Sequence, residues 1–291
     1  AIVLGKRGFG RVHLVEAEPE IGGITRWIPQ LPGRGEWGRI LNWRTIQLGK
    51  LADVETLTGL RLDADGVRAY GAEIVVVATG AHWSPVGLNR ETHEPIEGAD
   101  ASFPHVLTPE QIMVDGKRPP GERVVVYDSD GYFMGPDLAE KLAVEGHRVE
   151  LVSSLEDVAP FAHETLEQVF LKERLHELGV RMHRGTTIGS VEAERVSGAD
   201  EFGDPFELET DSIVLVTQRV SDDALYHELR ADEERLEAEG IEAVYRIGDC
   251  VAPQLIADAI FDGHRLAREI DSENPAVPLP FVRERPVSAL A

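Results

Sequence analysis

The sequence predicts an α/β protein made of two nested three-layer domains whose sheets are mainly parallel. Two continuous apolar runs, IVVVATG at 74–80 and SIVLVT at 212–217, have the composition of parallel strands buried on both faces. Residues 123–153 read as strand, turn, helix and second strand, and a strand ending in Gly-Asp at 248–249 lies far downstream. We therefore expect the last segment of the chain to close the first domain around an inserted second one.

The domain boundaries follow from this arrangement. Residues 1–98 and 240–270 are predicted to form the first domain and to share one parallel sheet. Residues 104–238 are predicted to form the inserted domain. Residues 271–291 are rich in prolines and charges and are expected to form an extended C-terminal arm. The chain has 291 residues, which is enough for two domains of ordinary size.

The first elements of the chain resemble the end of a dinucleotide-binding motif. Residues 12–17 form a strong strand, and Glu16 lies near its end, where an acid accepts hydrogen bonds from a ribose hydroxyl. Only six residues separate Gly5 from Val12, whereas a parallel crossover needs at least about 10–12 residues. Residues 1–7 are therefore expected to be the end of a helix. The strand and glycine-rich turn before that helix are expected to be missing upstream.

The remaining elements are read from apolar spacing and capping residues. Thr108 and Gln111 form a capping-box pattern that predicts the start of a short helix. Further helices are predicted at 36–51, 166–178 and 253–270, and strands at 53–62, 180–183 and 245–249.

The turn of the second dinucleotide-type motif has lost its glycines. A working turn reads G-x-G-x-x-G, so that backbone N–H groups approach a pyrophosphate at a helix N-terminus. Here residues 128–135 read DSDGYFMG, and we expect Asp128 and Asp130 to repel a phosphate. Residues 152–154, Val-Ser-Ser, offer neither an acid for NAD nor an arginine for NADP. The inserted domain is therefore predicted to bind neither cofactor.

Composition excludes several classes of partner and site. The net charge of −23, with 52 acidic against 29 basic residues, disfavours nucleic acid and anionic membranes. No apolar run approaches the roughly 20 residues that span a bilayer. The single cysteine, Cys250, excludes an internal disulfide, which fits a cytoplasmic location, and excludes a four-cysteine iron–sulfur site in this chain. No histidine pair has metal-ligand spacing, so no metal site is predicted.

Four segments together resemble a known family. They are VHLVEAEPEIGG (12–23), VVVATGAHW (75–83), DSDGYFMGPDLAEKLA (128–143) and IGDCVAPQLIADAIFDGHRLAREI (247–270). The chain resembles the C-terminal half of trimethylamine, dimethylamine and histamine dehydrogenases. The resemblance implies two nested Rossmann-like domains of the FAD/NAD(P)-binding type. It also implies an N-terminal barrel with FMN and an iron–sulfur cluster outside this sequence, a homodimer, and an electron-transferring flavoprotein or similar carrier as electron acceptor.

The resemblance also implies that the first domain holds ADP, or FAD. The Ala-Thr-Gly turn either contacts the nucleotide directly or is only a tight turn after a core strand, and both alternatives stay open. For Arg26 and Trp27, contact and packing stay open. The predicted cofactor-binding residues are Glu16, Ala17, Gly22, Gly23, Arg26, Trp27, Ala78, Thr79, Gly80, Gly248 and Asp249.

The leading functional hypothesis is the ADP-binding part of an iron–sulfur flavoprotein amine dehydrogenase. On this hypothesis the oxidative chemistry lies in the missing barrel, and this segment alone is not catalytic. One alternative is the FAD-binding half of an NAD(P)H-dependent enoate or dienoyl-CoA reductase, which the degenerate turn disfavours. The other is an interaction module with a nucleotide fold and no ligand, which an intact upstream glycine turn would argue against.

Overall fold

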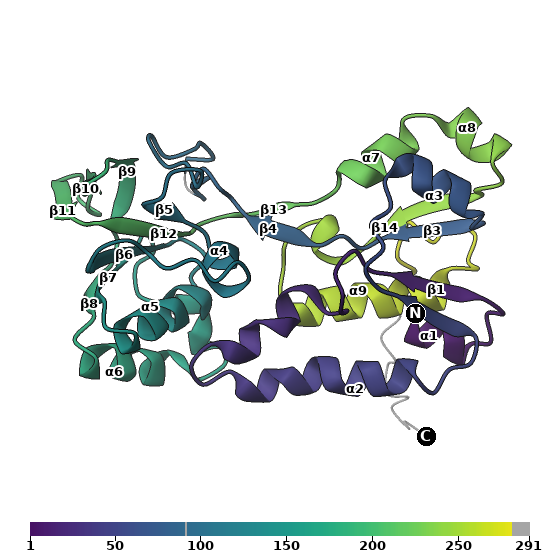
Figure 1. The fold of residues 1–291 in the computed structure, drawn as a ribbon, viewed down its shortest axis with the longest axis horizontal. Coiled ribbons are helices and arrows are strands. Elements are labelled where there is room, and N and C mark those ends of the chain that lie inside the picture. The colour runs from purple at the N-terminus through teal and green to yellow at the C-terminus, as the bar shows by residue number, and fades with distance from the viewer. Residues whose placement is uncertain (91, 281–291) are drawn as a thin grey trace, which may run out of the picture. The chain divides into compact units, whose positions relative to one another are not determined.

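The computed structural model describes residues 1–90 and 92–280, and these divide into two compact units. Both units combine helices with mainly parallel strands (Figure 1), so the predicted α/β class is confirmed. The first unit contains Ala1–Ile21, Trp43–Gly80 and the chain from Ser221 onward, and the second contains Gly22–Asn42 and Ala81–Val220.

The second unit has three layers around a parallel sheet. Its strands are β5 (Val106–Leu107), β6 (Arg123–Asp128), β7 (Arg148–Ser153), β8 (Arg181–His183) and β12 (Ser212–Val216), in the spatial order β5-β12-β6-β7-β8. Helix α5 (Met134–Val144) packs on β6 and β7, and α6 (Gln168–Glu177) packs beside α5 (Figure 1). The helix α4 (Pro109–Met113) begins at the predicted capping box, in which Thr108 and Gln111 each bond the other's backbone.

The opposite face of this sheet is covered by strands that the sequence did not predict. The strands β9 (Thr187–Val191), β10 (Arg195–Ala199) and β11 (Pro205–Glu209) form an antiparallel sheet in the order β11-β10-β9. Their apolar residues join the core of the parallel sheet. The glycines and charged residues of this segment are typical of a loop. In the structure, however, alternate residues of β11 face the core, as in a strand with one buried face.

The first unit contains two separate pairs of parallel strands. The strand β1 (Val12–Val15) pairs with β2 (Val54–Leu57), and β3 (Ile74–Val77) pairs with β14 (Ala243–Arg246). The predicted single sheet is not seen within the described residues, because none of their strands bonds both β1 and β3, and it stays a prediction. The predicted strand at 245–249 also ends earlier, since Gly248 begins a 3-10 turn, η5 (Gly248–Cys250).

Helices of the first unit pack on the β3–β14 pair and on one another. The helices α3, α7 and α8 share one apolar cluster with β3 and β14, while α1 packs against α9. Their bounds are α1 Ile2–Lys6, α3 Ala64–Tyr70, α7 Ala224–Arg230, α8 Glu233–Ala238 and α9 Ile256–Glu269. The helix α1 ends before Gly8, whose φ of 82° fits the expected helix end.

Three further elements lie where the chain passes between the units. Helix α2 runs from Gly38 to Leu48, and β4 (Ala81–Trp83) pairs with β13 (Arg219–Ser221). Of the predicted C-terminal arm, residues 271–280 form neither helix nor strand, and residues 281–291 lie outside the described residues.

The observed boundaries differ from the predicted ones at three places. Residues 22–42 and 81–98 were predicted in the first domain but pack with the second unit. Residues 221–238 were predicted in the second domain but pack with the first unit. The predicted boundaries kept neighbouring stretches of sequence in one domain. The segment 22–42 instead packs with the second unit, because an arginine in it bonds residues more than a hundred positions later.

That arginine is Arg34, which is only 3% exposed. Its Nε donates to Asp137 Oδ2 over 2.6 Å, and its Nη1 donates to Glu167 Oε1 over 2.8 Å. Its guanidinium lies 4.4 Å from the centre of the Phe133 ring, and Trp37 contacts the same ring at 5.0 Å. Burial raises the pKa of Asp137 to about 7, although the hydrogen bond and the charge of Arg34 act to lower it. This contact fastens the segment 22–42 to the first turn of α5.

We predict that Arg34→Met destabilises the protein by about 3–5 kcal/mol, because it leaves the buried Asp137 carboxylate unpaired. The matched control is Arg39→Met, whose pair with Glu36 is exposed and is worth about 0–1 kcal/mol. Urea unfolding measures both, and the double variant Arg34→Met with Asp137→Leu should recover part of the loss. Equal losses for Arg34→Met and Arg39→Met would contradict the assignment.

A second buried carboxylate lies beneath the degenerate turn at 128–135. Asp128 is 0% exposed, and its Oδ1 accepts hydrogen bonds from the backbone N–H groups of Asp130 and Gly131, each over 3.0 Å. The carboxyl group also packs on Gly135, where an added Cβ would lie 2.6 Å from it. Burial, with a smaller effect of Asp130, raises the pKa of Asp128 to about 7.

We predict that this carboxyl group makes stability fall as pH rises. Between pH about 4 and 7 the folded protein keeps the Asp128 proton that the unfolded chain has lost, so raising pH favours unfolding. Relative to Asp128→Asn, whose amide oxygen still accepts both N–H bonds, the unmodified protein should lose about 1.4 kcal/mol per pH unit there. Chemical unfolding of both proteins at several pH values measures the difference.

A pH-independent difference between these two proteins would contradict the prediction. Asp211→Asn provides a contrast of opposite sign. Hydrogen bonds from Arg123 lower the pKa of Asp211, so its contribution is present above its unfolded pKa and is lost at acid pH.

Candidate functional site

Two turns of the first unit meet at the C-terminal ends of neighbouring parallel strands. The turn Ala78–Gly80 follows β3, and the turn at Gly248 follows β14. The backbone N–H of Asp222 donates to Gly80 O over 3.0 Å, and Thr79 Oγ1 donates to Asp222 O. Ligands of open parallel sheets bind at such strand ends, so this corner is the candidate site.

The Gly-Asp turn is held in a fixed conformation. Gly248 has a φ of 65°, which favours glycine, and it begins η5. Ser221 Oγ donates to Asp249 O over 2.8 Å, which ties η5 to the segment that also holds Thr79. Asp249 Oδ1 accepts the Gln254 N–H over 3.1 Å, so this oxygen shapes the loop before α9. The backbone of the turn is therefore positioned from several sides.

Glu16 directly follows β1, as predicted, and is half-buried. Its Oε1 accepts the Glu18 N–H over 3.0 Å, which fixes the side chain above its own turn. Its other oxygen, Oε2, makes no hydrogen bond within residues 1–90 and 92–280. A carboxylate at this place can accept hydrogen bonds from a ribose hydroxyl. Ala17 beside it is half-buried, and Ala78 on the other turn is exposed.

Four of the predicted site residues belong to the second unit. Gly22 has a φ of 130°, and an added Cβ would lie 2.8 Å from Leu41, so this position requires glycine. Gly23 begins η1 (Gly23–Arg26), which ends at Arg26. Trp27 is 6% exposed, which favours packing, one of the two roles left open for it. The structure therefore assembles the other seven predicted residues in the first unit and these four in the second.

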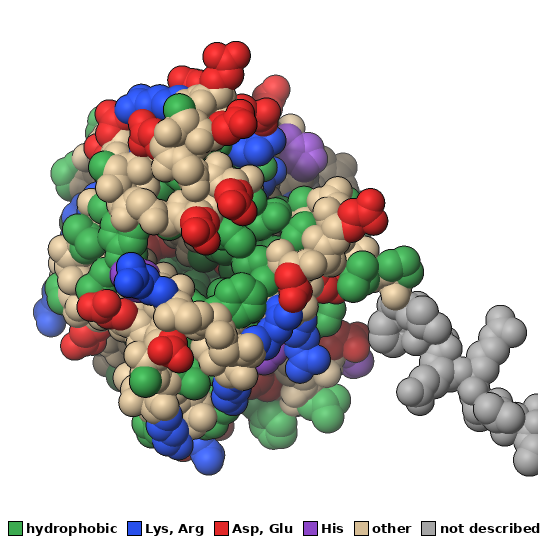
Figure 2. Space-filling view, turned by 90° about the vertical axis from the view of Figure 1, so that its right-hand side faces the viewer, with side chains coloured by type: hydrophobic (Ala, Val, Ile, Leu, Met, Phe, Trp, Pro, Cys, Tyr) green, Lys and Arg blue, Asp and Glu red, His purple; other side chains and the backbone are tan. Residues whose placement is uncertain are grey.

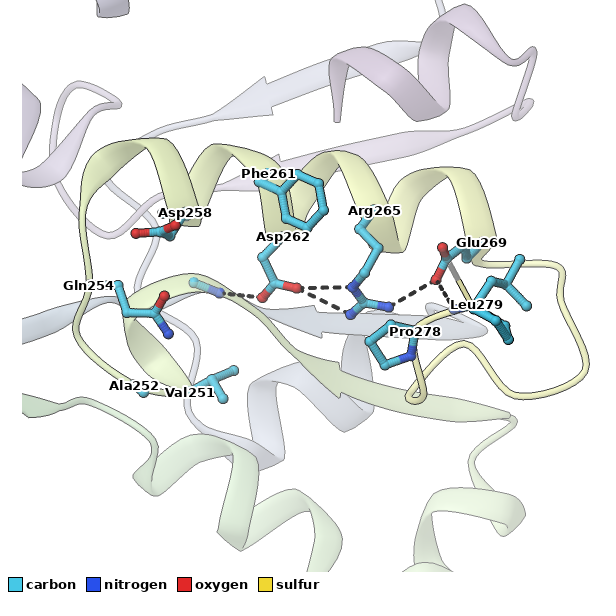
Figure 3. Close-up of a pocket in the computed structure, with 13 residues that line it drawn as sticks. Val251, Ala252, Gln254, Asp258, Phe261, Asp262, Arg265, Glu269, Pro278 and Leu279 are labelled. Atoms are coloured by element: carbon cyan, nitrogen blue, oxygen red, sulfur yellow. Dashed lines mark hydrogen bonds and ion pairs between the residues drawn. The ribbon is translucent and has the colours of Figure 1, made fainter. Parts of the chain in front are cut away.

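A cavity of about 610 Å³ lies between η5, α9 and the segment 278–280 (Figure 3). Of the predicted site residues, only Gly248 lines it. Figure 3 shows Asp262, Arg265 and Glu269 in a row along α9, with Pro278 and Leu279 facing them from the last described segment.

In the second unit, the corresponding strand ends are closed by the protein itself. Repulsion of a phosphate by the carboxylates of Asp128 and Asp130 was expected, but Asp128 points inward and accepts the turn's own N–H groups. Those N–H groups are the donors that a phosphate uses in a working motif. The expected charge repulsion is therefore corrected for Asp128, whose side chain fills the turn from beneath.

Sequence reasoning missed Ser221, Asp222 and Asp262. Asp222 contacts Thr79 across 143 residues of chain and Ser221 contacts Asp249 across 28, and no local pattern indicates such contacts. Asp262 could have been found, because Asp262, Arg265 and Glu269 have the spacing of ion pairs along a helix.

The described residues also limit what else the site can hold. Within residues 1–90 and 92–280, no group of three or more His, Cys, Asp or Glu residues is placed to bind a metal ion. In the same residues, no helix has the length and apolar character needed to cross a bilayer.

Known proteins share sequence similarity with this chain over most of its length. The chain is 41% identical to dimethylamine dehydrogenase from Hyphomicrobium sp. (strain x) over 309 aligned residues, which cover 98% of this chain and 42% of that protein. Residues 107–220 match the family described as the OYE-like second alpha/beta domain.

Solved structures agree with the sequence comparison. Histamine dehydrogenase from Rhizobium sp. 4-9 superposes with a TM-score of 0.91 at 36% identity, covering 97% of this chain and 43% of that one. The 6-hydroxypseudooxynicotine amine oxidase from Pseudomonas geniculata N1 superposes with a TM-score of 0.86 at 38% identity, covering 92% and 39%. The chain spans about two fifths of the length of these relatives and is similar to them over 92–98% of its own length.

Proposed function

We propose that this chain is the ADP-binding portion of an oxidoreductase that oxidises amines at a CH–NH bond. The relatives named dimethylamine dehydrogenase and histamine dehydrogenase support the reaction class. The observation that carries the nucleotide is the corner of the first unit, where Thr79, Gly80 and Gly248 present backbone at the ends of adjacent parallel strands.

The residues of the first unit fit an adenosine diphosphate group. Glu16 offers a carboxylate oxygen at a strand end, where a ribose hydroxyl binds and a 2′-phosphate would be repelled. Gly248 has no side chain to block the approach of a ligand to the turn. In the second unit, Gly22 and Gly23 have positive φ, and they stay predicted cofactor-binding residues together with Arg26 and Trp27.

The strands of the first unit are less covered than parallel strands usually are. Every residue of β1 and β2 is half-buried or exposed, and Ile74 on β3 is 37% exposed. Figure 2 looks onto this unit and shows hydrophobic side chains in a hollow with charged side chains of both signs around it. We propose that a further strand and its glycine-rich turn, from the parent protein, lie between β1 and β3 and complete the nucleotide site.

The remaining functions are proposed for the parent protein. The relatives extend well beyond this chain, and we propose that the corresponding segment is a barrel that carries FMN and an iron–sulfur cluster and oxidises the amine. The electrons would then pass to an electron-transferring flavoprotein or a similar carrier. A homodimer in the cytoplasm is part of the same proposal, and FAD in place of ADP is the alternative ligand.

The second unit is proposed to bind neither NAD nor NADP. Asp128 occupies the turn's N–H donors, and the half-buried Asp130 carries a second carboxyl group beside them. Arg34 and Trp37 lie on Phe133 of the same turn, where a dinucleotide would have to approach. This unit serves as a scaffold, which argues against the NAD(P)H-dependent reductase.

We predict that the parent protein releases ADP on denaturation and that Glu16→Ala weakens its ADP binding about tenfold or more. The reason is the loss of charge-assisted hydrogen bonds to the ribose, each worth about 1.5–3 kcal/mol. Calorimetric titration of nucleotide-free protein measures the affinity, and Glu18→Ala, two residues along, is the matched control. A Glu16→Ala protein that purifies with full ADP occupancy and unchanged affinity would contradict the assignment. Release of FAD would support the alternative ligand.

We also predict that NADH and NADPH do not bind to the parent protein at micromolar concentration. Asp130→Asn removes one charge and leaves the Asp128 side chain in the turn, so this variant should not bind them either. Fluorescence titration of both proteins checks this, with ADP as the positive control. Saturable micromolar binding, or reduction of the protein by NADPH, would favour the reductase hypothesis instead.

A further inference from the structure

Helix α9 carries a row of charged side chains that ends at the Gly-Asp turn. Asp262, Arg265 and Glu269 lie at successive turns on one face of the helix, and Figure 3 shows them bonded in a chain. Their side chains are 28%, 13% and 16% exposed. Pairs that are this well covered are screened by solvent and salt less than surface pairs are.

One end of the row holds the turn. The Gly248 N–H donates to Asp262 Oδ2 over 2.8 Å, and this bond joins η5 to the middle of α9. The other oxygen, Oδ1, accepts from Arg265 Nη2 over 3.1 Å and from Nε over 3.3 Å. Asp262 therefore has one oxygen for the backbone of the turn and one for the guanidinium that orients it.

The opposite end holds the last described segment of the chain. Arg265 Nη1 donates to Glu269 Oε2 and to the carbonyl oxygen of Pro275, each over 3.1 Å. Glu269 Oε2 also accepts the Leu279 N–H over 3.4 Å. The conformation of residues 275–279 is therefore connected to Asp262 through a single guanidinium.

We propose that Asp262 is a positioning residue for nucleotide binding and that residues 275–279 stabilise its orientation through Arg265. This inference rests on the proposed function, since it requires that the Gly248 turn meets the nucleotide. Asp262 fixes the direction of the Gly248 N–H and the place of the positive-φ turn. Arg265 neutralises the carboxylate, so that no uncompensated negative charge stands beside an anionic ligand. The last segment shields this pair by lying over the cavity.

The test measures ADP affinity and unfolding free energy in the nucleotide-free parent protein. Asp262→Ala should weaken ADP binding about tenfold, the loss expected for a hydrogen bond with a charged partner. Asp262→Asn should restore most of the affinity, because its amide oxygen can still accept the Gly248 N–H. His264→Ala, an exposed position on the same helix, is the control and should bind as the unmodified protein does.

The role of the last segment is tested by coupling. Truncation after Asn274 and Arg265→Gln should each weaken ADP binding several-fold, and neither should add its full effect to Asp262→Ala, because all three act on one contact. Arg265→Gln retains the bulk of the side chain and keeps the test valid if Asp262→Ala does not fold.

The outcomes separate this inference from the proposed function. If the unmodified protein binds no ADP, the proposed function fails and this inference fails with it. If it binds ADP and Asp262→Ala or Arg265→Gln binds equally well, this inference alone is overturned. Fully additive losses for Asp262→Ala and the truncation would also overturn the connection to residues 275–279. An unfolding free energy that falls while ADP affinity holds would mean that Asp262 has only a structural role.

Discussion

Parallel strands need cover on both faces, and this requirement organises the whole chain. In the second unit it is met completely: β12 is buried along its length, with α5 on one side of the sheet and the strands β9–β11 on the other. In the first unit the strands are only half covered. The two units thus have related patterns of strands and helices, but only the second has a complete sheet within the described residues.

Burial of the sheet by α5 does not depend on the sequence of the turn at 128–135. The helix α5 packs on the sheet through residues such as Leu138 and Leu142, both 0% exposed, and these contacts do not involve the turn. The apolar core therefore holds the helix in place whatever the turn binds. Asp128 accepts the N–H groups of Asp130 and Gly131 in the turn before the helix. The Asp130 N–H also reaches Val216 O over 3.3 Å, so the Gly131 N–H is the one that depends on Asp128.

The sequence was sufficient where a signal is local. The strand, helix and strand at 123–153 were predicted from apolar runs, and the short helix after Thr108 from its capping box. Glu16 and Gly248 were likewise placed at strand ends. The sequence was insufficient where a distant partner decides. Residues 22–42 pack with the second unit because Arg34 bonds Asp137. The direction of the Asp128 side chain depends on where the folded turn places its N–H donors.

The contact between Asp128 and Gly135 bears on the history of the turn. The carboxyl group occupies space that exists only because residue 135 has no side chain, and it satisfies two N–H groups that need an acceptor. Glycine at 128 alone would leave a hole and an unpaired Gly131 N–H, while the Asp130 N–H would keep Val216 O as an acceptor. Replacing Asp128 by glycine alone would therefore give a less stable protein, so a single substitution at this position does not readily convert the turn to the glycine-rich form.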